Sequence, residues 1–147
     1  MLLSGWARAV GLRVAVVRAP DATPLVREAT ARLGVGLLAA GFDPIEVDAD
    51  GHVDARRAIE VAGEAAGAFA TMSLWPVPHS AAVDVWIADA TTRETTVRRI
   101  AVVVRNRPAA SRAIAVRAIE LLRDELVDRL NGVSSGADGA RGYESHR

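Results

Sequence analysis

The stretch VDVWIADATTRETTVRRIAVVV at residues 83–104 decides the fold, because its pattern turns back on itself in the middle. Val83, Val85 and Ile87 alternate with Asp84, Trp86 and Ala88, and this period of two predicts a strand with one buried face. Residues 91–94 are polar and predict a turn, and the β-branched residues of 95–104 predict a return strand. We therefore expect an antiparallel hairpin.

Upstream of the hairpin, short apolar runs alternate with helical patterns. Runs at residues 13–18, 45–47 and 68–75 predict three strands. Apolar residues at helical spacing predict one helix from Pro24 to about residue 40 and another from Ala55 to Ala66. Thr23 and Asp54 precede these helices as N-cap residues, and a glycine follows each of them.

Downstream of the hairpin, the sequence predicts a last helix over residues 109–130, with Pro108 at its start. The expected order is β-α-β-α-β-β-β-α. This order predicts an α/β fold of the mixed (α+β) type. Three helices are expected to pack on a five-stranded sheet that has both parallel and antiparallel strands.

The chain is expected to form one domain over residues 10–131. Residues 132–147 hold almost nothing apolar and are expected to be a disordered tail. Residues 1–9, MLLSGWARA, are interpreted as the remnant of a signal peptide, because Ala7 and Ala9 fit the small-x-small pattern before a cleavage site. This predicts a periplasmic or secreted protein, or a cytoplasmic one if the segment is no signal remnant. No run approaches the roughly 18 apolar residues of a transmembrane helix, so no integral membrane segment is expected.

Composition argues against several kinds of chemistry. The chain holds no cysteine for a thiol nucleophile or a thiolate metal site, and no lysine for a Schiff base or a P-loop. Its 18 basic residues balance 18 acidic residues, so the chain has no overall field to attract nucleic acid. Arginines between Arg98 and Arg117 are offset by acids on the last helix, and no nucleic-acid partner is expected.

No motif predicts catalysis or cofactor binding. Gly34-x-Gly36-x-x-Ala39 matches the dinucleotide fingerprint in letters, but it falls in the second half of a predicted helix and not directly after a strand. Ser73, His79, Asp84 and Asp89 are the residue types of a triad, but no nucleophile elbow surrounds Ser73 or Ser80. The three histidines are scattered, so no catalytic, cofactor or metal residue is assigned.

Trp75, Trp86 and His79 are the residues of a possible interaction surface. The two tryptophans flank the loop 76–82 that carries His79. If buried, they are expected to form a cross-strand aromatic pair; if exposed, they would anchor a partner. A second possibility is a ligand pocket at His79 or at Asp21, whose loop follows a strand and precedes a helix.

The hairpin from Val83 to Thr95 resembles that of the TolB N-terminal-type and curli-secretion-type α/β domains of bacterial envelopes. The order of elements over residues 12–130 is compatible with that family. Arg93 stands where such hairpins often have glycine, and Glu94 where they often have a basic residue. The resemblance implies a non-enzymatic interaction or assembly module with an envelope protein as partner, and it transfers no catalytic residue. The alternative is a cytoplasmic small-molecule-binding or hydrolytic α/β domain.

Overall fold

The computed structural model describes residues 11–103 and 105–144, with side chains described as far as residue 129. Its elements follow the predicted order β-α-β-α-β-β-β-α, which confirms the expected fold class. They are β1 (Arg13–Arg18), α2 (Pro24–Ala39), β2 (Asp43–Asp48), α3 (Ala55–Ala66), β3 (Ala70–Pro76), β4 (Val83–Asp89), β5 (Thr95–Ile100) and α4 (Arg107–Glu144).

The five strands form one mixed sheet in the order β2-β1-β3-β4-β5. β1 lies between β2 and β3 and is parallel to both, with Val17 opposite Val47 on one side and Ser73 on the other. β3, β4 and β5 are antiparallel in succession. The carboxyl ends of β1 and β3, which are far apart in sequence, therefore lie side by side.

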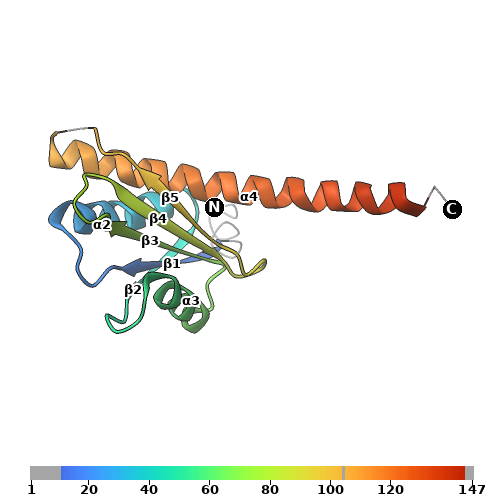
Figure 1. Cartoon of the computed structure of the whole chain (residues 1–147), viewed down its shortest axis with the longest axis horizontal. Coiled ribbons are helices and arrows are strands. Elements are labelled where there is room, and N and C mark those ends of the chain that lie inside the picture. Colours follow the sequence, from blue (N-terminus) through green and yellow to red (C-terminus); the bar gives the residue numbers. More distant parts are fainter. Residues whose placement is uncertain (1–10, 104, 145–147) are drawn as a thin grey trace, which may run out of the picture.

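The two faces of the sheet are covered unequally (Figure 1). α2 and the first half of α4 pack on one face, where Val16, Leu33, Met72 and Leu122 belong to the main core. Of the helices in the described part of the chain, α3 packs on the other face. Because α3 is only 12 residues long, it covers only part of this second face.

Local signals in the sequence explain where the helices begin and end. Thr23 Oγ1 accepts a hydrogen bond from the amide of Val26, and a carboxylate oxygen of Asp54 accepts one from the amide of Arg57. Gly67 ends α3 in a left-handed conformation, with φ of 60°. The predicted N-caps and this C-cap are thus confirmed.

The hairpin turn also has a physical explanation. Asp89 Oδ1 accepts hydrogen bonds from the amides of Thr91 and Thr92, and these bonds hold the start of the turn. Arg93 adopts a φ of 60°, the left-handed conformation that glycine reaches at least cost. Glycine at position 93 would therefore adopt this backbone conformation at a lower cost than arginine does.

Several predicted boundaries are wrong. The strands expected at 45–47 and 68–75 are Asp43–Asp48 and Ala70–Pro76. The return strand was expected to reach residue 104, but β5 ends at Ile100, which lies opposite Val83, the first residue of β4. No residue of β4 remains to pair with those beyond Ile100. The last helix was expected over 109–130, but it begins at Arg107.

α4 continues past residue 131, the expected end of the domain, and its helical backbone extends to Glu144 (Figure 1). The expectation that residues 132–147 form a disordered tail stays a prediction. A helix that is already formed adds one hydrogen bond for each further residue, so it can extend through a segment with few apolar side chains. The proposed signal remnant, residues 1–9, lies outside the described residues. Within the described ranges, no helix is both long and apolar enough to cross a membrane.

Candidate functional site

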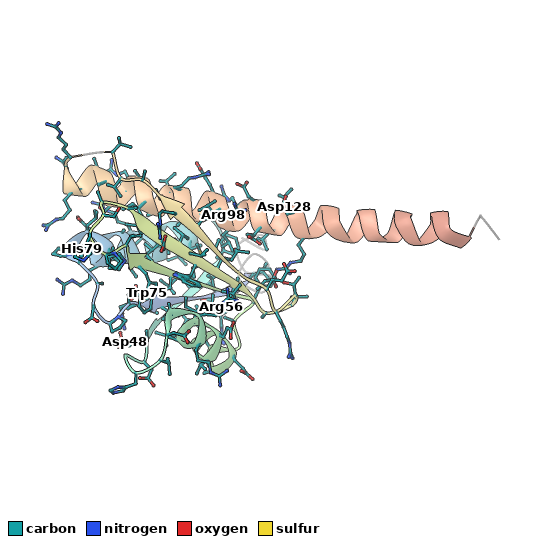
Figure 2. The ribbon with its side chains drawn as sticks, viewed as in Figure 1. Asp48, Arg56, Trp75, His79, Arg98 and Asp128 are labelled. Atoms are coloured by element: carbon teal, nitrogen blue, oxygen red, sulfur yellow. The ribbon has the colours of Figure 1, made fainter. Side chains whose placement is uncertain are left out.

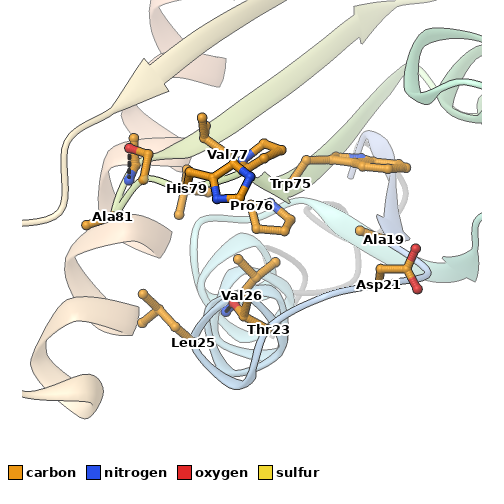
Figure 3. A pocket seen from close by; sticks show the side chains of 14 residues that line it. Ala19, Asp21, Thr23, Leu25, Val26, Trp75, Pro76, Val77, His79 and Ala81 are labelled. Atoms are coloured by element: carbon orange, nitrogen blue, oxygen red, sulfur yellow. Dashed lines mark hydrogen bonds between the residues drawn. The ribbon is translucent and has the colours of Figure 1, made fainter.

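A pocket lies at the carboxyl ends of β1 and β3, where the loops that follow these strands come together. Because β1 and β3 are parallel neighbours, the loop before α2 and the loop before β4 meet at this edge (Figure 3). The pocket has a volume of about 720 Å³. Its lining is mainly apolar and comprises Ala19, Asp21, Thr23, Leu25, Val26 and residues 75–83.

Trp75 forms one wall of this pocket, and a chain of two hydrogen bonds fixes the orientation of its indole. The indole Nε1 donates a hydrogen bond of 2.8 Å to Ser73 Oγ, which donates one of 2.7 Å to the carbonyl oxygen of Val17. Ser73 is fully buried. The indole N–H is therefore already satisfied, and Trp75 offers the pocket an aromatic ring of fixed orientation.

His79 lies at the tip of a tight turn, and its imidazole is drawn beside Pro76 (Figure 3). The amide of Ser80 donates to the carbonyl of Val77 at 3.3 Å, which closes a four-residue turn with Pro78 and His79 at its centre. His79 has a φ of 58°. This conformation costs a residue other than glycine on the order of 1–3 kcal/mol, and such strain is concentrated at functional sites.

The loop between β1 and α2 supplies the third side of the pocket. Asp21 is exposed and is the one formally charged residue among those of the lining. Thr23 caps α2 with its side chain, and Pro24 occupies the first helical position. The close-up places Asp21 on the same side as Trp75, with Ala19 between them (Figure 3).

Trp86 belongs to the neighbouring surface and does not line this pocket. It lies opposite Ser73, and Trp75 lies opposite Asp84, so the two tryptophans are diagonal neighbours on the face that carries α3. Both are half-buried. They therefore form no directly opposed pair, and neither is wholly in the core. The structure brings Trp75 and His79 of the expected surface into one pocket and leaves Trp86 beside it.

The candidate triad residues are engaged elsewhere. Ser73 Oγ donates to a backbone carbonyl, and Asp84 accepts two hydrogen bonds, of 2.9 and 3.3 Å, from the guanidinium of Arg99. The hydrogen bond to Asp84 raises the pKa of Arg99. Among the described residues, no hydrogen bond joins His79 to either Ser73 or Asp84. Neither Ser73 nor Asp84 is therefore joined to this histidine.

The glycines of the fingerprint-like sequence lie well inside α2, away from its N-terminus. Gly34 faces the side chain of Glu46 on β2, and Gly36 faces Ile119 of α4. Gly34 therefore lets α2 approach β2 closely, whereas Gly36 serves the contact with α4. In the described part of the chain, no three His, Asp or Glu side chains gather as potential metal ligands.

A charged cluster beside the pocket was missed by sequence reasoning. Arg18 at the end of β1 donates to Asp48 at 2.7 Å and to Glu46 at 2.6 Å on β2. The hydrogen bond from Arg18 holds the pKa of Asp48 below its ordinary value. Figure 2 places Asp48 and His79 at the same end of the molecule. The even spacing of Glu46 and Asp48 was the available signal, because strand residues two apart share a face.

Comparisons of the chain with protein-family models, with curated proteins and with solved structures found no match. The resemblance to the TolB N-terminal-type and curli-secretion-type domains stays a prediction from the sequence.

Proposed function

We propose that this chain is a non-catalytic ligand-binding domain whose site is the pocket between Trp75, His79 and Asp21. The observation that carries the proposal is that two loops over 50 residues apart in sequence meet at the carboxyl ends of β1 and β3 and border an open pocket of about 720 Å³. Ligands of open α/β sheets bind at this edge. The volume falls within the range of about 300–1,000 Å³ that small-molecule sites occupy.

The walls of the pocket support binding because they are positioned before a ligand arrives. The indole of Trp75 is tied through Ser73 to the backbone of β1. The turn at His79 is closed by its own backbone hydrogen bonds, including one from the amide of Val77 to the carbonyl of Ala82 at 3.2 Å. A preformed site loses little conformational entropy on binding. Binding without catalysis is favoured because the nearby Ser73 and Asp84 are engaged with other groups.

Fragment binding followed by NMR tests the proposal on the whole chain. We expect fragments to shift the resonances of Trp75, His79 and Leu25 together, because these residues share the pocket. Ala81→Phe should abolish these shifts, since residue 81 lines the pocket and is exposed enough to accept a larger side chain. Ala90→Phe is the matched control, because Ala90 is also exposed but follows the other end of β4. Shifts scattered over the surface, or unchanged by Ala81→Phe, would refute the proposal.

A second candidate function is the envelope interaction or assembly module that the sequence predicts. The observation in its favour is that Trp86 lies half-buried beside Val97, which is 44% exposed, on the face that α3 covers only in part. Val97→Glu should then abolish co-purification of an envelope partner. Val61→Glu, on the exposed side of α3, should leave it intact. Equal effects of the two variants would remove this surface from consideration.

Export is a separate part of the second proposal, and fractionation of the native cells tests it. A periplasmic or secreted protein whose mass corresponds to a start at Val10 would support it. A cytosolic species that retains Met1 would contradict the signal-peptide interpretation.

A further inference from the structure

We infer that the pocket between Trp75, His79 and Asp21 takes a ligand with a cationic head group, an ammonium or a guanidinium, on an apolar body. This inference rests on the proposed ligand-binding function and specifies its chemistry. The lining favours a cation because Asp21 is its one formally charged residue and the walls beside Asp21 are apolar or aromatic.

The aromatic wall favours a cation as well. Because Ser73 already accepts the indole N–H of Trp75, the indole presents its ring and has no free donor. The face of an indole attracts ammonium and guanidinium groups through its quadrupole, more strongly than the face of any other side chain. Trp75 and Asp21 lie on the same side of the pocket, so one cation can be attracted by both (Figure 3).

The N-terminus of α2 borders the pocket but is poorly suited to bind an anion. A helix N-terminus binds phosphate through amide groups that lack a partner in the helix. Here Pro24 has no amide hydrogen, the amide of Val26 donates to Thr23 Oγ1, and the amide of Arg27 donates to the carbonyl of Thr23. The carboxylate of Asp21 would also repel a phosphate. The carboxyl edge of the sheet, which binds nucleotides in many α/β proteins, is thus unfavourable for nucleotides in this chain.

The nearest arginine on β1 does not cancel the charge of Asp21. Arg18 is bound to both Glu46 and Asp48, so its guanidinium is already engaged with two carboxylates. Among the described residues, Asp21 itself forms no ion pair. Its carboxylate is therefore available to a ligand.

Three probes that differ in charge test the inference: 2-phenylethylammonium, 2-phenylethanol and 3-phenylpropanoate. Each is titrated into isotope-labelled whole chain at low salt and pH 8, where an ordinary imidazole is neutral. The indole resonance of Trp75 and the methyl resonances of Leu25 and Val26 report binding in the pocket. We expect the ammonium probe to bind about three- to tenfold more tightly than the alcohol, and the carboxylate to bind most weakly.

Asp21→Asn should weaken binding of the ammonium probe about two- to fivefold and leave that of the alcohol unchanged. Asp124→Asn is the matched control, because it removes the same charge from an exposed position on α4, which does not line the pocket. Binding of the alcohol or the carboxylate as tight as that of the ammonium would overturn the charge preference and leave the binding function standing. No response of the pocket resonances to any probe, nor to the fragments, would overturn both.

Discussion

Replacing Gly63 with alanine tests how closely α3 packs on the sheet. An added Cβ would lie inside contact distance of Thr71 Oγ1 and 3.2 Å from the Cβ of Thr71. Thr71 is 3% exposed and lies on the central strand β3, so it has little room to move. Overpacking of this kind costs about 1–3 kcal/mol.

Two effects of the Gly63→Ala substitution oppose each other, and their balance gives the sign. Alanine favours the helical state over glycine by about 1 kcal/mol, so at an exposed position the substitution would stabilise the protein. At Gly63 we expect the cost of the clash to lie in the upper half of its range, about 2–3 kcal/mol, because Thr71 is buried on a central strand. Less the gain from alanine, the substitution should lower the free energy of unfolding by about 1–2 kcal/mol. The melting temperature should then fall by about 3–8 °C.

A double-mutant cycle separates the clash from other causes. Thr71→Ala removes Oγ1, so Gly63→Ala should be far less harmful in that background, with a coupling energy of at least about 1 kcal/mol. Gly36→Ala is the control, because its Cβ would meet the flexible end of Ile119 and not a group on a central strand. Urea unfolding measures all of these variants. Unchanged or raised stability of Gly63→Ala, or no coupling to Thr71, would refute the reasoning.

Three further predictions concern the turn and the ion pairs. Arg93→Gly should raise the free energy of unfolding by about 1 kcal/mol because φ at this position is 60°, and an unchanged urea midpoint would contradict this. Arg18→Gln should raise the pKa of Asp48 toward its ordinary value in an NMR titration. Because the folded-state pKa of Asp48 is lowered, the stabilisation that its pair with Arg18 gives is present at neutral pH and lost as the pH falls through that pKa. A difference in stability between Arg18→Gln and the unaltered chain that persisted in acid would argue against this origin. Arg129→Met should lower the free energy of unfolding by about 1–3 kcal/mol, since it leaves the carboxylate of Asp89, 11% exposed, without its guanidinium partner. Adding Asp89→Asn to that variant should recover part of the loss. An Arg129→Met variant as stable as the unaltered chain would exclude a contribution from the pair.

Signals that act within a few residues were reliable in the sequence. Thr23 and Asp54 cap their helices because a side-chain oxygen reaches an amide three residues further along the chain. The alternation of Val83, Val85 and Ile87 predicted the buried side of β4, because side chains of a strand point to alternate faces. The ends of β5 and α4 were wrong, since they depend on where a partner strand begins and on how far a formed helix extends.

The sequence by itself determined the class and order of the elements, the caps of α2 and α3, and the hairpin of β4 and β5. Only the tertiary structure decided that β1 pairs with β3, and that pairing builds the pocket. Asp21 and His79 are 58 positions apart, and no local pattern relates them. They come together because burial of the apolar faces of both strands, with their hydrogen bonds, fixes the parallel register, and the register fixes which loops meet.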